Sequence, residues 1–217
     1  MRENQIAVQM LSDYWGYFIN ITTQLEKRNT LSNPIPDFDH NLVLPPHLGN
    51  PTFMADISPY KCTTLQLCEK YATSQKRIDI LKGFISFRQK LYNHNVFNGF
   101  QWIDGSFLED VATREKREPN DLDVVTLYWG YDIAFQKDLM VKFPEFADNR
   151  LSKNSYLIDH FPFDISITPF ITVDMTRYWM QLFSHNRDGV WKGMLQINID
   201  TPNEDRDALA YLNATKL

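Results

Sequence analysis

Cysteine is scarce in this sequence, and long hydrophobic runs are missing. The two cysteines, Cys62 and Cys68, have no histidine beside them at zinc-ligand spacing, which argues against a zinc finger or a disulfide-stapled secreted domain. We expect reduced thiols in a cytosolic core. No apolar segment approaches the roughly 18 residues that a membrane-spanning helix needs, and residues 2–5 do not lead into a signal peptide. The sequence therefore predicts a soluble, cytoplasmic protein with no membrane partner.

An excess of positive charge is also lacking. The 217 residues include 27 acidic and 22 basic side chains, which gives a formal net charge of -5. This balance argues against a protein that coats nucleic acid through bulk electrostatics, although it is compatible with a local basic groove. The composition, 43% hydrophobic and 23% charged, is that of an ordinary globular protein, and we expect one compact domain.

The chain divides into three stretches. Residues 1–60 combine an N-terminal helix with a proline-rich wrapping arm, residues 61–200 form the main domain, and residues 201–217 are a short helix or a frayed tail. The helix is predicted over residues 6–27 from apolar residues at helical spacing: Leu11, Tyr14, Trp15, Phe18, Ile21 and Leu25. The arm is irregular because of its prolines: Pro34, Pro36, Pro45, Pro46, Pro51 and Pro59.

Helices precede strands in the main domain. Thr63 and Gln66 are spaced as a capping box, and a second helix is predicted to start at Ser74. The elements expected after them are strands over residues 100–104 and 122–128, a helix over 131–143, an alternating strand over 161–170 and a final hairpin turning at Asp188-Gly189.

Asp121 and Asp123 place two carboxylates in an otherwise apolar strand. Because successive strand residues point to opposite faces, both project from one side, with their backbones roughly 6 to 7 Å apart. The two charges repel each other unless a cation lies between them, and Mg²⁺ takes oxygen ligands while leaving positions for phosphate. Asp164, in the alternating strand, is the expected third ligand or base. Asp159 is the alternative, although the alternation favours Asp164 because Asp159 lies in a predicted turn.

Gly105 and Ser106 form a small turn after the strand that ends at Asp104. A glycine lets backbone N–H groups approach a phosphate closely, and a serine hydroxyl can donate to it. A metal site beside such a turn indicates phosphoryl chemistry. Lys192 is a further candidate phosphate contact, with a solvated lysine on an exposed hairpin as the alternative.

Three motifs carry a family resemblance. In chain order, "WIDGSF", "PNDLDVV" and "FPFDISI" resemble the active-site pattern of the DNA polymerase beta-like nucleotidyltransferase superfamily. Residues 35–197 together resemble a family of small bacterial nucleotidyltransferase-like proteins. The implied fold is α/β (α+β), with a mixed, mostly antiparallel sheet flanked by helices.

The resemblance also implies an activity and roles for residues. The expected reaction is Mg²⁺-dependent transfer of a nucleotidyl group from an NTP or dNTP to a hydroxyl, with release of pyrophosphate. Gly105 and Ser106 match the turn that holds the triphosphate, Asp121 and Asp123 the metal pair, and Asp164 the third carboxylate around two Mg²⁺ ions. Small members of the superfamily resemble toxin, antitoxin and phage-defence enzymes, so a role in such a system is expected.

One departure from the pattern is the long loop between the turn and the metal pair. Fourteen residues separate Ser106 from Asp121, and the extra length is strongly charged. The loop is either a lid whose Arg114, Lys116 and Arg117 reach the triphosphate or acceptor, or a solvated segment of mixed charge.

The acceptor stays open at this level. An RNA end, an oligonucleotide, a small alcohol or a protein hydroxyl would each suit the same metal geometry, and Tyr211 in the C-terminal segment is a self-modification candidate. Two rival classes are a catalytically silent nucleotide-binding module, acting with a protein partner or a second copy of the chain, and a two-metal nuclease or phosphohydrolase.

Overall fold

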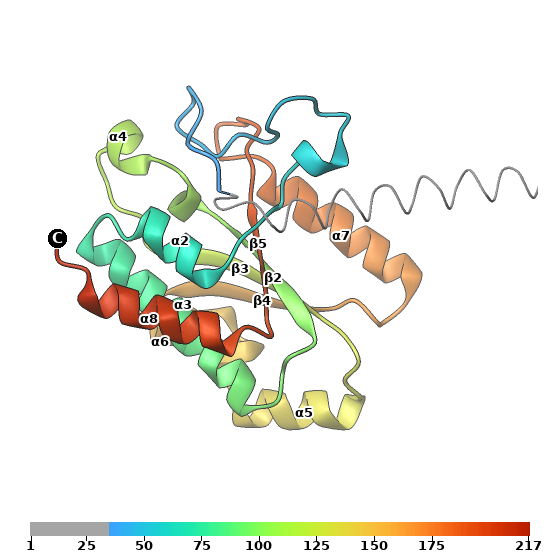
Figure 1. The fold of residues 1–217 in the computed structure, drawn as a ribbon. Helices are drawn as coiled ribbons and strands as arrows, with labels where there is room; N and C mark the ends of the chain where they lie inside the picture. The colour runs from blue at the N-terminus through green and yellow to red at the C-terminus, as the bar shows by residue number, and fades with distance from the viewer. Residues whose placement is uncertain (1–34) are drawn as a thin grey trace, which may run out of the picture.

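A five-stranded mixed sheet organises the protein (Figure 1). The structure, a computed structural model, describes residues 35–217, so the helix predicted over residues 6–27 lies outside the described residues. The strand order is β1-β5-β2-β3-β4, with β1 at Tyr60–Lys61, β2 at Gly99–Asp104, β3 at Leu122–Tyr128, β4 at Ile158–Asp164 and β5 at Leu195–Asn198. The two pairings of β2 are antiparallel, whereas β1 with β5 and β3 with β4 are parallel. The predicted α/β class with a mixed sheet is confirmed, and antiparallel pairing is confined to the centre of that sheet.

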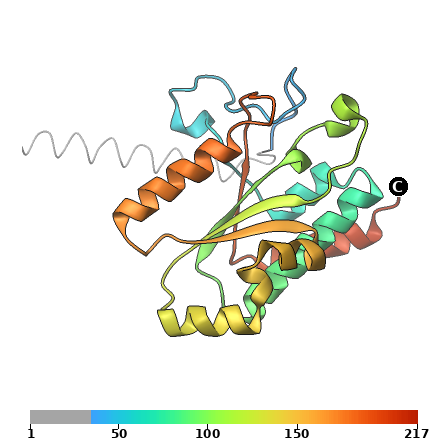
Figure 2. The ribbon, with the colours of Figure 1, turned by 180° about the vertical axis from the view of Figure 1, so that it is seen from behind.

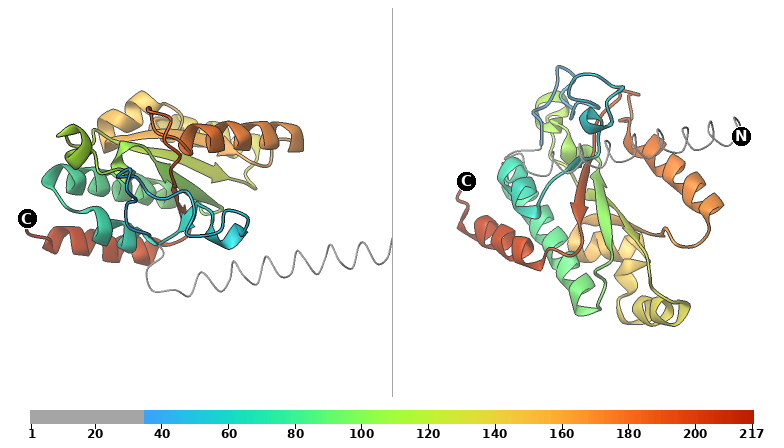
Figure 3. Two further views of the ribbon diagram at one scale, coloured as in Figure 1. Left: turned by 90° about the horizontal axis from the view of Figure 1, so that it is seen from above. Right: turned by 45° about the vertical axis from the view of Figure 1, so that its right-hand side comes forward.

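Helices cover the two faces of the sheet unequally. The face with the larger core carries α2 (Thr64–Tyr71), α3 (Gln75–Asn93), α5 (Ile133–Lys142), α6 (Asn149–Tyr156) and α8 (Pro202–Ala214). Among the helices of residues 35–217, α7 (Pro169–Phe183) is the one that covers the other face, over a smaller core (Figures 2 and 3). The alternation of β3 explains the division, because Leu122 and Val124 enter the larger core while Val125 and Leu127 enter the smaller one. None of the helices within residues 35–217 combines the length and the apolar character that crossing a bilayer requires.

Local capping starts the first two helices where the sequence predicts them. The Thr63 hydroxyl accepts from the Gln66 N–H at 3.1 Å, and the Gln66 side chain accepts from the Thr63 N–H at 2.9 Å, which completes the capping box. The Ser74 side chain accepts from the N–H of Arg77 and caps α3 in the same way.

Two strand predictions in the C-terminal half are wrong in extent. The strand expected over residues 161–170 ends at Asp164, because Thr168 caps α7 and Pro169 occupies its first turn. The hairpin expected around Asp188-Gly189 is reduced to a single bridge between His185 and Trp191, since the preceding residues continue α7. The tight turn itself is present, with Gly189 at a φ of 75°.

The C-terminal segment is an integral part of the domain. The sequence predicts either a short helix or a frayed tail for residues 201–217. The structure shows the helix, α8, which packs on α2 and α3. Its Asp205 is buried and accepts from Arg88 of α3, with 2.8 Å between Arg88 Nε and Asp205 Oδ2. Arg88 also donates to Gln101 of β2 at 2.6 Å, so one buried guanidinium joins α3, α8 and the sheet.

Replacing Arg88 by Met is expected to lower the free energy of unfolding by about 3–5 kcal/mol, because it leaves the Asp205 carboxylate buried without its counter-ion. Urea unfolding followed by circular dichroism measures the effect. Lys90→Met, at an exposed position of the same helix, is the control and should change stability by less than about 0.5 kcal/mol. Equal stability of the two variants would contradict a structural role for this ion pair.

Candidate active site

Three adjacent strands bring carboxylates together at one end of the sheet. Asp123 of β3 pairs in register with Asp104 at the end of β2 and with Asp159 near the start of β4. Residues directly opposite each other on neighbouring strands point to the same face and lie about 4.5–5.5 Å apart at Cβ. Asp121 precedes β3 by one residue and extends the same cluster. We call Asp104, Asp121, Asp123 and Asp159 the acidic cluster.

Asp164 does not belong to the acidic cluster, and the predicted convergence with Asp121 and Asp123 is wrong. It pairs with Tyr128, at the opposite end of β3 from Asp123. Asp164 lies five positions after Asp159 in the same strand, which amounts to roughly 16 Å along the strand. Five is also an odd number, so the two side chains point to opposite faces. Asp164 instead accepts hydrogen bonds from Gln136 of α5 and from the N–H of Ser166, each at 2.8 Å.

The Gly105-Ser106 turn lies directly against the acidic cluster. Gly105 has a φ of 85°, and a Cβ added there would lie 2.1 Å from Oδ2 of Asp123. Only glycine leaves space for that carboxylate and accepts this backbone conformation. Ser106, partly exposed, begins the short 3₁₀ helix Ser106–Leu108. The predicted turn and the predicted metal pair are therefore neighbours in space.

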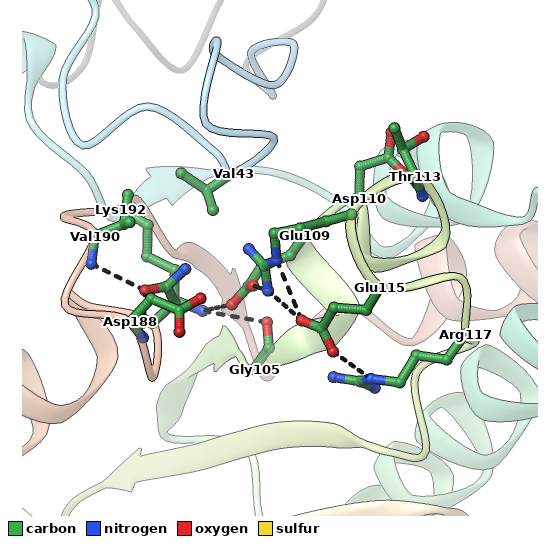
Figure 4. A network of polar contacts seen from close by, with 12 residues as sticks. Val43, Gly105, Glu109, Asp110, Thr113, Glu115, Arg117, Asp188, Val190 and Lys192 are labelled. Carbon is green, nitrogen blue, oxygen red and sulfur yellow. Dashed lines mark hydrogen bonds and ion pairs between the residues drawn. The ribbon is translucent and has the colours of Figure 1, made fainter.

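Lys192 is buried beneath this turn, and the alternative of a solvated lysine on an exposed hairpin is wrong. Its side chain is 2% exposed, and Nζ lies 2.8 Å from Oε1 of Glu109 and 3.0 Å from Oδ1 of Asp104. It also donates to the carbonyl oxygen of Gly105 at 3.2 Å (Figure 4). One ammonium thus holds the turn, the end of β2 and Glu109 together.

Further contacts fix the segment that follows the turn. Arg77 of α3 donates to the carbonyl oxygens of Phe107 and Glu109 at 2.7 and 3.0 Å. The proline-rich arm reaches the same place, since Val43 pairs with Glu109 and the Leu44 carbonyl accepts from the N–H of Gly193. The arm therefore contributes to the support of the candidate site.

The charged loop between the turn and β3 carries its own ion pairs. Arg114, in the short helix α4 (Val111–Glu115), contacts Glu109 and Glu115 at 2.6 Å each. Arg117 contacts Glu115 at 2.5 Å (Figure 4). Both guanidinium groups are therefore engaged with carboxylates of the loop itself. This arrangement favours the alternative of a mixed-charge segment over a lid that reaches a triphosphate.

Burial raises the pKa of two carboxylates of the cluster, and the crowding of like charges contributes to the rise. Burial raises the pKa of Asp104 to about 7, against the attraction of Lys192. Burial, together with repulsion from Asp121 and Asp159, raises the pKa of Asp123 to about 6. A positive charge is supplied from outside the cluster by Lys153 of α6, which contacts Asp121 and lies 3.9 Å from Asp159. The cluster attracts cations.

The acidic cluster has suitable donor atoms for Mg²⁺ but no preformed metal cage. Within residues 35–217, no group of three or more His, Cys, Asp or Glu side chains is arranged to hold a metal ion. The donor chemistry nevertheless fits Mg²⁺, since the cluster offers only carboxylate oxygens, and two of its carboxylates, Asp121 and Asp159, already lie near the Lys153 ammonium. The acidic cluster therefore suits Mg²⁺ in its residue types and in its strand register, but its side chains do not form a preformed cage.

Tyr211 is part of the ordered helix α8 and packs against the larger core. Asp123 points to the opposite face of the sheet, where the smaller core lies, because it alternates with Leu122 and Val124. The structure therefore places this tyrosine away from the acidic cluster of its own chain.

Sequence reasoning missed Asp104 and Glu109 and ranked Asp159 below Asp164. Asp104 has a signal in the sequence, because it closes an apolar strand directly before the turn. Asp159 does not, because its register with Asp123 depends on how β3 and β4 pair in the assembled sheet. Glu109 has no comparable signal, because its partner Lys192 is 83 residues away in the chain.

The fold and site together define a mixed α/β protein with clustered carboxylates beside a glycine-led turn. The chain belongs to a family of unknown function, DUF6932, whose sequence model matches residues 36–198. No curated protein and no solved structure matches the chain. The family description names no activity, so the resemblance to nucleotidyltransferases stays a prediction.

Gly105→Ala is expected to destabilise the protein by about 2 kcal/mol or more beyond Gly189→Ala. Both glycines have positive φ, but a Cβ at Gly189 meets nothing within 4 Å, so this control carries the cost of a positive φ alone. Gly105 adds the contact with Asp123 and a ψ of -173°, a backbone region open essentially to glycine. Chemical denaturation of both variants measures the difference. Equal losses would show that the Asp123 carboxylate does not need the space beside Gly105.

Asp123→Asn is expected to be more stable than the wild type at pH 8 in EDTA, by about 1–3 kcal/mol. The pKa of Asp123 is raised from 3.8 to about 6, so the folded state binds this proton more tightly than the unfolded state. The ionised carboxylate therefore costs stability as the pH rises from about 4 to 6, and the full cost applies above that window. Urea midpoints measured from pH 4 to pH 8 should converge at the acid end; parallel curves would contradict the raised pKa.

Proposed function

We propose that this protein is a Mg²⁺-dependent nucleotidyltransferase that moves an NMP or dNMP from the triphosphate to a hydroxyl acceptor and releases pyrophosphate. One observation carries the proposal: Asp104, Asp123 and Asp159 stand in register on three adjacent strands, directly beside the Gly105-Ser106 turn. Carboxylates next to a phosphate-binding turn are the arrangement that metal-assisted phosphoryl transfer requires.

Asp121, Asp123 and Asp159 are the side chains that would hold Mg²⁺. Asp159 replaces Asp164 in this role, because it is in register with Asp123 whereas Asp164 lies at the other end of β4. When bound, Mg²⁺ neutralises phosphate charge and lowers the pKa of an attacking hydroxyl. Asp104, the fourth member of the cluster, is already engaged by the buried Lys192.

The chain's own groups supply binding and orientation. Ser106, which is partly exposed at the start of its 3₁₀ helix, would donate from its hydroxyl to a phosphate oxygen. Lys192 acts on the Gly105 carbonyl and keeps the turn in position, and its burial precludes the direct phosphate contact proposed from the sequence. The two lysines of the site thus differ in role, with Lys192 structural and Lys153 facing solvent.

A catalytically silent nucleotide-binding module is the second candidate. Lys153 already provides a counter-charge to Asp121 and Asp159, and no preformed metal cage lies within residues 35–217. Such a module would bind nucleotide together with a protein partner or a second copy of the chain, and would release no pyrophosphate.

The setting that we propose is the cytoplasm, in a phage-defence or toxin-antitoxin system. Both cysteines are free thiols, and burial raises the pKa of Cys68 to about 12, which keeps it protonated and unreactive. The acceptor would be an RNA end, an oligonucleotide or a protein hydroxyl. Tyr211 of the same chain is disfavoured as an acceptor by its position on α8.

Asp123→Asn and Asp159→Asn are each expected to lower pyrophosphate release by about a thousandfold or more, because each removes a carboxylate proposed to hold the cation. Asp164→Asn is the matched control and should stay within about threefold of the wild type. The assay screens all eight NTPs and dNTPs with Mg²⁺, with and without cell RNA, on variants whose circular dichroism matches the wild type.

Full turnover in Asp123→Asn would end the nucleotidyltransferase assignment. A loss in Asp164→Asn that equals the loss in Asp159→Asn would contradict the choice of third carboxylate. Nucleotide binding by calorimetry with no pyrophosphate from any of the eight nucleotides would favour the silent module.

A further inference from the structure

Lys153 occupies a position over the acidic cluster that a bound cation would also seek. Its Nζ contacts Oδ2 of Asp121 and lies 3.9 Å from Oδ2 of Asp159. The lysine comes from α6, whose Asn149 donates to the other carboxylate oxygen of Asp159 at 3.1 Å. Asn149 and Lys153 are four residues apart and therefore lie on one face of the helix. This face of α6 covers two carboxylates of the cluster.

The ammonium is attracted by three of the four carboxylates of the cluster. The hydrogen bond to Asp121 raises the pKa of Lys153 above its ordinary value, with further attraction from Asp159 and Asp123, against a modest cost of burial. The same three carboxylates repel one another, as the raised pKa of Asp123 indicates. A positive charge at this position therefore offsets repulsion that the strand register imposes.

Lys153 is free to leave this position, whereas Lys192 is not. The Lys153 side chain is 49% exposed, and its flexible stem can turn into solvent without opening a cavity. Lys192 is 2% exposed and bound to Asp104, Glu109 and the Gly105 carbonyl. Asp121, under Lys153, is 15% exposed, so a cation arriving from solvent can reach the carboxylate once the lysine moves away.

We propose that Lys153 is an internal counter-ion that holds the acidic cluster together in the metal-free protein and that a divalent cation must displace in order to bind. The proposal rests on the divalent-cation part of the proposed function and adds a competitor supplied by the chain itself. Lys153 then sets the metal affinity of the site: the stronger its ion pair with Asp121, the higher the cation concentration that loading requires.

Lys153→Met is expected to bind Mn²⁺ about three- to tenfold more tightly than the wild type, because the cation no longer competes with the ammonium. Mn²⁺ binding to the full-length protein, without nucleotide, is measured by electron paramagnetic resonance. Arg150→Met is the matched control: it removes the same charge from the same helix, where Arg150 is 85% exposed and pairs with Asp148. This control should stay within about twofold of the wild type.

Thermal unfolding provides a second readout. In EDTA, Lys153→Met is expected to melt below the wild type, because carboxylate repulsion is no longer offset, and it should gain more in Tm on addition of Mn²⁺. Arg150→Met should show neither change.

Each outcome bears on a different proposal. Equal Mn²⁺ affinity in Lys153→Met and the wild type overturns the counter-ion proposal and leaves the nucleotidyltransferase proposal intact. Tighter binding in Lys153→Met, combined with no pyrophosphate release by any variant, supports the counter-ion and overturns the enzyme. If no variant binds Mn²⁺, both proposals fail.

Discussion

The pairing register of β3 is the constraint on which the site depends. Antiparallel pairing with β2 sets Asp123 opposite Asp104, and parallel pairing with β4 sets it opposite Asp159. Register in a sheet with both faces covered is strongly specified, because a slip of one residue would move Leu122 and Val124 out of the larger core. Burial of apolar side chains thus forces carboxylates together at one end of the sheet. The clustering of charge is a consequence of the packing of the hydrophobic residues.

Crowded carboxylates require positive charge, and the protein supplies it from two directions. Lys192 lies beneath the cluster, is buried, and ties Asp104 to Glu109 and the Gly105 carbonyl. Lys153 lies above it, is half exposed, and contacts Asp121. A buried ion pair is costly to break, whereas an exposed one is exchanged easily. The inner lysine therefore maintains the shape of the turn, and the outer one is replaceable by a ligand.

Features that depend on neighbouring residues are predicted from the sequence more accurately than contacts between distant residues. The capping box at Thr63, the helix start at Ser74 and the strand 122–128 depend on neighbouring residues, and the structure has them where the sequence places them. The strand expected to run through residues 161–170 was wrong at its end, because Thr168 and Pro169 start a helix and this signal outweighs alternation.

By itself the sequence determined the α/β class, the glycine-led turn and the shared face of Asp121 and Asp123, because each follows from residue type and spacing over a few positions. The tertiary structure alone decided that Asp159 joins them and Asp164 does not, since the offset between parallel strands depends on which residues the connecting helices bury. It also decided that Lys192 is buried, because its partner Glu109 is 83 residues distant. Contacts of that range depend on the assembled core, and no short stretch of sequence contains the information.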